Sequence, residues 1–353
     1  MKLLRLAPVL SIALLLAGCS SGSAAHPASS PVASATPIPR IAEPSRQLGI
    51  DIDFYAYSGM DVAQTAQQDI AYVKGLDANA VSIAFPVFSN PPGTTVEATN
   101  RTPTTAQLGQ LIVAAERAGL AVTLRPLLDE KSIGVTRVFW TPASLTKWFA
   151  AYLRFLRPYA ALAQADHVAT FAVGVELTKF GAVPQWDTLD SALRTIYHGT
   201  LAYSNNWTTS EHATPGNGGA GVTEMTAAYP PLQLPDDATT AAVTAAWSRW
   251  ARPLPKGTVL SEVGIAALSG AYSHPYESGP ASTALTPQIQ ATWFSGACRA
   301  VAIDNLGGLY FWSVNFGQSL TTPAGASEPA AFTDTPGAAA IAQCFTSLAV
   351  GPR

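Results

Sequence analysis

From residue 47 onward, short apolar stretches rich in β-branched and aromatic residues alternate with longer stretches whose apolar positions recur every three or four residues. The short stretches are typical of buried strands, and the longer ones of amphipathic helices. The predicted strands cover residues 48–57, 80–88, 120–128, 170–177, 199–205, 222–229, 258–263 and 309–314. This regular alternation predicts an α/β fold built on parallel strands.

The predicted helices lie between these strands, at residues 61–76, 104–118, 184–197, 238–251, 287–302 and 338–348, with a further helix starting near Pro142. Thr104 is suited to cap its helix and Gly119 to end it. A glycine-rich stretch at residues 215–221 has no strand leading into it, so it predicts a turn and no phosphate site. Eight strand–helix units over roughly 300 residues predict a single-domain (β/α)₈ TIM barrel. A doubly wound open sheet is the alternative, although no dinucleotide fingerprint follows the first strand.

The N-terminal 19 residues differ from the rest of the chain. A basic start and an apolar run at residues 6–16, too short to span a bilayer, lead into Leu16-Ala17-Gly18-Cys19. This motif resembles a bacterial lipobox, in which the thiol of Cys19 is acylated and the preceding peptide is removed. Residues 20–46 are rich in Ser, Ala and Pro and predict a disordered tether. We therefore expect residues 47–353 to be lipid-anchored to a bacterial membrane, outside the cytoplasm. An ordinary signal peptide with a chance cysteine is the alternative.

Composition narrows the classes of function. With 48% hydrophobic and 12% charged residues, the chain can bury a large core. A formal net charge of −3 gives no basic footprint for nucleic acid. The five histidines and three cysteines show no zinc-ligand spacing, and the sequence contains no Walker loop, HExxH or GxSxG motif. We therefore expect no metal, no organic cofactor and no nucleic-acid partner.

Two cysteines, Cys298 and Cys344, fall on the last two predicted helices, which would be neighbours in an eight-fold barrel. In an oxidising compartment these residues could form a disulfide. Two buried free thiols are the alternative.

Two glutamates close predicted strands. Glu176 ends the fourth strand and Glu262 the seventh, each within an otherwise apolar run where an unpaired carboxylate would be costly. In a TIM barrel the active site lies at the C-terminal ends of the strands, and these two strands lie across the mouth from one another. Carboxylates standing about 5–5.5 Å apart could cleave a glycosidic bond with retention, one as acid with a raised pKa and one as ionised nucleophile. The alternative is that each glutamate pairs with a core arginine such as Arg125.

Aromatic residues also occur at or just beyond predicted strand ends: Tyr55, Phe85, Trp207, Tyr229 and Trp312. Sugar rings stack on aromatic faces, so a barrel mouth with these residues predicts a carbohydrate cleft. For any single one of them except Trp312, packing in the core is the alternative that burial favours.

Five stretches, at residues 102–129, 173–177, 203–207, 228–232 and 260–264, are similar to glycoside hydrolase family 113. That family belongs to a clan of retaining (β/α)₈ glycosidases, and its characterised members are β-1,4-mannanases. The resemblance implies that Glu176 is the acid/base and Glu262 the nucleophile. It also implies that Tyr229 hydrogen-bonds the nucleophile, that Trp312 is the platform under the sugar, and that Asn206 and Trp207 contact the substrate.

The same resemblance suggests substrate-binding roles for Arg125, Asp129 and Arg137, to which we add Tyr55 at the end of the first strand. Three positions depart from the pattern. Val175 stands where the clan often has the asparagine that binds the sugar 2-hydroxyl, and Leu127 where the family commonly has histidine. The usual Trp-Arg-Gly run becomes Thr136-Arg137-Val138, with only the arginine kept.

The sequence thus predicts a monomeric retaining glycoside hydrolase with an oligo- or polysaccharide substrate, β-1,4-mannan first, and with the lipid bilayer as partner through acylated Cys19. The same chemistry on a glucan, a xylan or an envelope polysaccharide is a second hypothesis. A third is a non-catalytic, lipid-anchored glycan-binding barrel.

Overall fold

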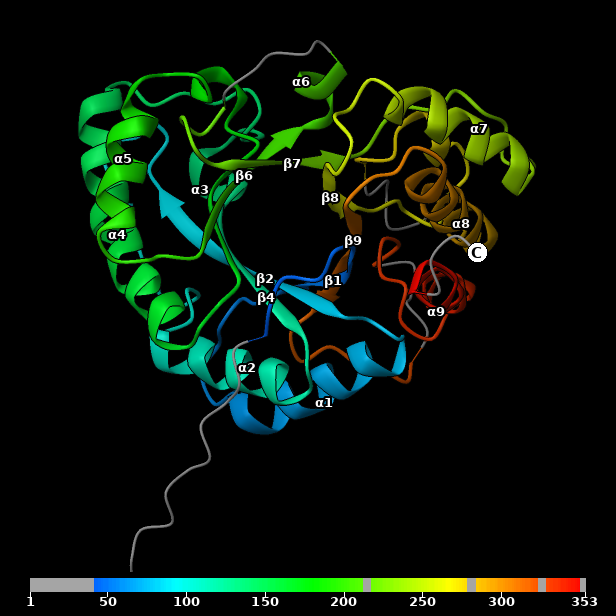
Figure 1. Ribbon diagram of the computed structural model, residues 1–353, viewed down its shortest axis with the longest axis horizontal. Helices are drawn as coiled ribbons and strands as arrows, with labels where there is room; N and C mark the ends of the chain where they lie inside the picture. The colour runs from blue at the N-terminus through cyan, green and yellow to red at the C-terminus, as the bar shows by residue number, and fades with distance from the viewer. Residues whose placement is uncertain (1–40, 212–216, 278–283, 323–327, 350–353) are drawn as a thin grey trace, which may run out of the picture. The chain divides into compact units, whose positions relative to one another are not determined.

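The computed structural model describes residues 41–211, 217–277, 284–322 and 328–349. Within these residues, parallel strands form a closed ring in which each strand pairs with the next and the last pairs with the first (Figure 1). The strands of the ring are β1 (Gln47–Asp53), β2 (Ala80–Ser89), β4 (Ala121–Leu128), β5 (Thr170–Val175), β6 (Thr200–Asn206), β7 (Thr223–Ala228), β8 (Val259–Val263) and β9 (Gly308–Asn315). The predicted TIM barrel is confirmed.

Helices surround the ring on its outer side (Figure 1). They are α1 (Val62–Gly75), α2 (Thr105–Arg117), α4 (Leu145–Ala165), α5 (Gln185–Arg194), α7 (Thr240–Ala251), α8 (Pro287–Ile303) and α9 (Pro336–Ala349), with the short α3 (Glu130–Ile133) and α6 (Trp207–Glu211) at the ends of β4 and β6. Thr104 caps α2 in a reciprocal capping box with Gln107, as the sequence pattern predicts. Further one-turn helices are η1 (Thr178–Phe180) and η2 (Ala271–Ser273).

The apolar pattern overestimates two strands at their C-terminal ends. The first strand stops at Asp53 and leaves Tyr55 in the following loop, and the strand that begins at Thr170 stops at Val175. Glu176 has a positive φ of 53°, which is incompatible with a strand. The sequence also gave no sign of β3 (Val96–Glu97), which pairs antiparallel with β2, because two residues are too few to form a pattern.

Successive side chains of a strand point to opposite faces, so alternate residues of each strand face the inside of the ring and the surrounding helices. On β2, Ala80 and Ala84 belong to two small clusters whose buried members all come from barrel strands. Val81, Ile83 and Phe85 belong to the main core shared with the helices. Phe85 therefore follows the alternative of core packing and does not lie at the barrel mouth: its ring is fully buried.

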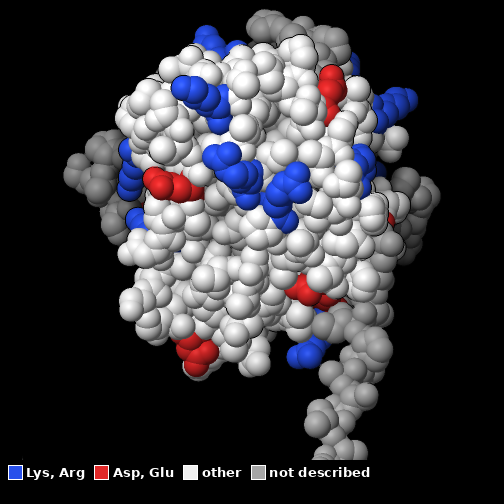
Figure 2. Space-filling view, turned by 90° about the vertical axis from the view of Figure 1, so that its left-hand side faces the viewer, with Lys and Arg blue, Asp and Glu red and all other residues white. Residues whose placement is uncertain are grey.

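The lipobox and most of the predicted tether, residues 1–40, lie outside the described residues, as do residues 215–216 of the glycine-rich stretch. In the described part of the chain, none of the helices combines the length and the apolar character needed to span a bilayer. On the face shown in Figure 2, acidic and basic side chains are scattered among a majority of uncharged residues.

Cys298 on α8 and Cys344 on α9 form a disulfide, with their Cα atoms 5.6 Å apart. The bond closes a loop between positions 46 apart in sequence, which restricts the unfolded chain. We expect the double variant Cys298→Ser/Cys344→Ser to lose about 2–4 kcal/mol of unfolding free energy. Chemical denaturation of both proteins, with and without a thiol reductant, measures this loss. Equal stability of the two oxidised proteins would contradict it.

Candidate active site

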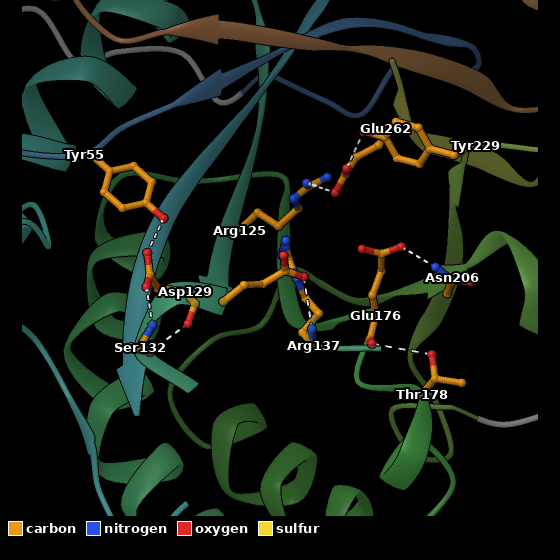
Figure 3. A network of polar contacts seen from close by, with 11 residues as sticks. Tyr55, Arg125, Asp129, Ser132, Arg137, Glu176, Thr178, Asn206, Tyr229 and Glu262 are labelled. Atoms are coloured by element: carbon orange, nitrogen blue, oxygen red, sulfur yellow. Dashed lines mark hydrogen bonds and ion pairs between the residues drawn. The ribbon is translucent and has the colours of Figure 1, made fainter. Parts of the chain in front are cut away.

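A cleft of about 700 Å³ lies at the C-terminal ends of the barrel strands. Glu176 and Glu262 both line it, together with Asn206, Tyr229 and Trp312. The two carboxylates point toward the same space (Figure 3). The structure thus brings together residues from β5, β6, β7, β8 and β9 that the sequence singled out separately.

Glu176 follows β5 directly, and its amide N–H donates to the carbonyl of Ser204 on β6 at 2.8 Å. A non-glycine residue with positive φ is strained, and such strain concentrates at functional sites. The Oε1 atom of Glu176 accepts a hydrogen bond from Nδ2 of Asn206 at 2.6 Å. Burial, followed by the charge of Glu262, raises the pKa of Glu176 to about 7, against the opposing effects of Arg137 and Asn206. Glu176 therefore keeps its proton in mildly acidic solution.

Glu262 lies within β8 and is held by two donors (Figure 3). Its Oε2 accepts the hydroxyl proton of Tyr229 at 2.8 Å. Its Oε1 pairs with Nη2 of Arg125 on β4. Burial and then the negative charge of Glu262 raise the pKa of Tyr229 well above its ordinary value, so the phenol stays protonated and donates. Both carboxylate oxygens of Glu262 thus accept from a donor, one a cation and the other a hydroxyl.

Glu262 pairs with Arg125, which partly matches the alternative that each glutamate only neutralises the charge of a core arginine. Arg125 is buried beneath the cleft and is not among the described residues that line it. Glu262, in contrast, lines the cleft while it binds Arg125. Within the described residues, Glu176 is hydrogen-bonded to Asn206, and Arg137 acts on it through its charge without forming an ion pair with it. The two carboxylates therefore share one cleft but differ in their partners.

Two acidic residues of β1, Asp51 and Asp53, were not predicted as part of the site. Asp51 on β1 is fully buried, with its Oδ1 3.5 Å from Nη1 of Arg125, which also donates to the carbonyl of Ser261 at 2.8 Å. Burial raises the pKa of Asp51 to about 8, although Arg125 opposes the shift, and burial likewise raises the pKa of Asp53 to about 7. The signal was available, because both are acidic residues within an apolar strand, as Glu176 and Glu262 are.

Two residues predicted to bind substrate, Tyr55 and Asp129, lie outside the lining of the cleft. The hydroxyl of Tyr55 donates to Oδ2 of Asp129 at 2.9 Å, and the guanidinium of Arg101 lies 4.7 Å from the centre of the Tyr55 ring. Oδ1 of Asp129 caps α3 by accepting from the amide of Ser132 at 2.8 Å. These contacts connect the loops after β1 and β4.

Arg137 does line the cleft. Its backbone N–H and its Nε both donate to Oε1 of Glu130, at 3.0 and 3.1 Å. The other two departures from the family pattern, Leu127 and Val175, pack with Ala84 in a buried apolar cluster that contacts Trp312. Neither of these two side chains can therefore offer a hydrogen bond to a ligand.

Trp207 and Trp312 line the cleft as expected, and the Arg125 guanidinium lies 5.3 Å from the Trp312 ring centre. The Trp312–Ser313 peptide bond is cis. Two further aromatic residues of the lining, Phe139 and Tyr276, were missed because they lie in long loops away from strand ends. Among the described residues, no group of three or more His, Cys, Asp or Glu side chains is placed to hold a metal ion.

The model of Glycoside Hydrolase Family 113 matches residues 53–332 of the chain. The chain belongs to glycoside hydrolase family 113. Membership in this family makes it a glycoside hydrolase, and the non-catalytic hypothesis loses its support. A search of curated proteins found no match.

Solved structures of family 113 share the fold. The β-mannanase AaManA from Alicyclobacillus acidocaldarius, in complex with ManMIm, has a TM-score of 0.70 at 20% identity, covering 86% of this chain and 98% of that one. A β-1,4-mannanase of family 113 has a TM-score of 0.72 at 17% identity, covering 86% and 99%. Outside the family, a GH5_18 protein from Streptomyces cattleya in complex with GlcNAc has a TM-score of 0.56 at 16% identity, covering 88% and 83%.

Proposed function

We propose that this family 113 enzyme hydrolyses a β-1,4-mannan-type polysaccharide with retention of configuration. Glu262 is the nucleophile and Glu176 the general acid/base. The observation that carries the proposal is the unequal environment of the two carboxylates in one cleft. Arg125 and Tyr229 stabilise the charge on Glu262, whereas burial and a neighbouring negative charge keep the proton on Glu176.

The reaction proceeds in two displacements. In the first, a carboxylate oxygen of Glu262 bonds to the anomeric carbon while the bond to the leaving oxygen breaks, and Glu176 gives its proton to that oxygen. In the second, a water molecule loses a proton to Glu176 and its oxygen bonds to the anomeric carbon. The bond between the anomeric carbon and Glu262 breaks in the same displacement, and both carboxyl groups return to their starting states.

The mannan preference is supported by the solved β-mannanases of the family, which have the same fold. Leu127, Val175 and the changed residues beside Arg137 alter the surroundings of the cleft, which keeps a glucan, a xylan or an envelope polysaccharide as a second candidate. Activity on defined β-1,4-linked manno-, gluco- and xylo-oligosaccharides separates these substrates.

Trapping the covalent intermediate tests the mechanism. A 2-deoxy-2-fluoro-β-mannosyl fluoride slows both displacements through its electron-withdrawing fluorine, but its good leaving group still allows the first. We expect inactivation with one glycosyl unit per protein and the label on the peptide that contains Glu262. A label on a different residue would contradict the assignment. NMR can determine the anomeric configuration of the first product of mannan hydrolysis. A first product that is not β-configured would rule out retention.

We also propose that acylation of Cys19 attaches the enzyme to a bacterial membrane, outside the cytoplasm. The support is the lipobox and the apolar run before it. In a bacterial host that processes lipoproteins, the full chain should incorporate labelled palmitate and sediment with membranes. Cys19→Ser should abolish both. Equal labelling of the variant would refute the proposal.

A further inference from the structure

Phe139 is held in an exposed position at one side of the cleft. Its side chain is 68% exposed, the highest value among large hydrophobic residues in the described part of the chain. The residues around it are anchored: Arg137 is bound to Glu130, and Trp140 is buried with its indole N–H donating to the carbonyl of Pro91 at 2.9 Å. The Phe139 amide closes a turn onto the carbonyl of Thr136 at 2.9 Å. The local structure therefore keeps an aromatic face in solvent.

Tyr276 is presented in a similar way on another loop. Its side chain is 53% exposed, and its neighbour Pro275 is buried. The ring lies nearly parallel to that of Trp207, with centroids 6.3 Å apart and an angle of 13°. The amide of Glu277 donates to the carbonyl of His274 at 3.0 Å, which closes the turn around Tyr276. Trp207 and this turn together fix the direction of the tyrosine ring.

The two loops stand on opposite sides of the barrel mouth. Phe139 follows β4 and Tyr276 follows β8, and in the closed ring three strands separate β4 from β8 on either side. Both residues line the cleft that also contains Glu176 and Glu262. An extended ligand that contacted both rings would therefore pass the two carboxylates.

The charges of the cleft favour an uncharged ligand. The lining contains four glutamates, residues 130, 176, 262 and 277, and one cation, Arg137. An acidic polysaccharide would be repelled by the excess of carboxylates, whereas a neutral sugar chain would not. Aromatic faces on both sides suit the apolar faces of pyranose rings.

We infer that Phe139 and Tyr276 are stacking sites for two sugar units of one neutral β-linked chain, on opposite sides of the bond to be cleaved. The ligand is thus an oligosaccharide several units long, bound along its interior, rather than a terminal sugar held in a closed pocket. This inference rests on the proposed function for the position of the scissile bond, but the binding itself does not depend on hydrolysis.

Binding to a catalytically silenced protein provides the test. In a Glu262→Gln background, calorimetry would measure the affinity for three neutral hexasaccharides (β-1,4-linked manno-, gluco- and xylo-) and for the matching disaccharides. We expect Phe139→Ala and Tyr276→Ala each to weaken binding of the best hexasaccharide by roughly five- to tenfold. The effect on the disaccharide should be smaller for at least one of the two variants, because a short ligand cannot reach both rings.

Two control variants sharpen the result. Tyr57 is 58% exposed in the loop after β1 but does not line the cleft, so Tyr57→Ala should leave hexasaccharide affinity unchanged. Tyr276→Phe keeps the ring and should keep the affinity. Hexasaccharide affinities unchanged in both alanine variants, or no hexasaccharide binding at all, would overturn the inference. A wild-type protein that binds a hexasaccharide through both rings but never cleaves it would instead refute the proposed function.

Discussion

Replacing Glu262 with alanine is expected to lower kcat by on the order of 10⁴-fold or more, because the first displacement loses its nucleophile. Removing one partner of a buried ion pair lowers stability. Arg125 keeps the carbonyl of Ser261 at 2.8 Å and Asp51 at 3.5 Å, so the fold should persist with a lower free energy of unfolding. Initial rates on mannan, compared at equal concentrations of folded protein by circular dichroism, measure the loss. Glu116→Gln is a matched control, because Glu116 is also a buried glutamate but lies on α2 away from the cleft.

Rescue by azide separates loss of the nucleophile from general damage. In Glu262→Ala, the azide anion can occupy the space of the missing carboxylate and bond to the anomeric carbon of an activated aryl β-mannoside. That single displacement inverts the configuration, so the product should be the α-mannosyl azide. A β-configured azide from this variant would assign the nucleophile to another residue, and near wild-type turnover without azide would remove Glu262 from the mechanism.

Replacing Glu176 with alanine should lower kcat on mannan by about 10³-fold, because the leaving oxygen no longer receives a proton. An aryl β-mannoside with an acidic phenol as leaving group needs no such proton, so its first displacement should be affected much less. Azide should then attack the accumulated intermediate and give the β-mannosyl azide, the opposite configuration to the Glu262 variant. Equal losses on both substrates would argue against Glu176 as the general acid.

The pH dependence provides a second readout for Glu176. Its pKa is raised to about 7, and its protonated form is the active one for the first displacement. For the wild-type enzyme, kcat/KM on a mannan oligosaccharide should therefore fall above pH 7, and the residual kcat/KM of Glu176→Gln on the same oligosaccharide should lose this alkaline decline. Between the ordinary pKa of a glutamate and about pH 7, Glu176 is protonated in the folded state but ionised in the unfolded chain. Stability from this group thus decreases as pH rises through that window, and Glu176→Gln should flatten that decrease.

Most of the architecture was predictable because it depends on local periodicity. The alternation of short apolar runs and helical runs identified each strand of the ring, and the period-two pattern within a strand determines which residues share a face. Phe85 is an example: it lies on the same side of β2 as Val81 and Ile83, so it faces the helices and packs in the core. The strand ends were overestimated because an apolar run does not reveal the positive φ of Glu176.

The partners of the candidate site were less predictable because they are remote in sequence. Arg125 binds Glu262 across 137 positions, and Tyr55 binds Asp129 across 74. Arg125 and Asp129 were expected to contact the substrate. Arg125 instead forms an ion pair inside the barrel, and Asp129 caps the start of α3. No local pattern distinguishes a residue that lines a cleft from one directly beneath it.

By itself, the sequence determined the (β/α)₈ class, the two glutamates at strand ends and the pair of cysteines on adjacent helices. These follow from interactions between residues close in the chain and from the face on which each residue lies. Only the tertiary structure decided which donors hold each carboxylate, that Asp51 lies next to Arg125, and that Phe139 and Tyr276 converge on one cleft. Those contacts depend on how the strands close into a ring and on how far each long loop extends over the barrel mouth. Interactions between residues that are close in sequence do not determine either.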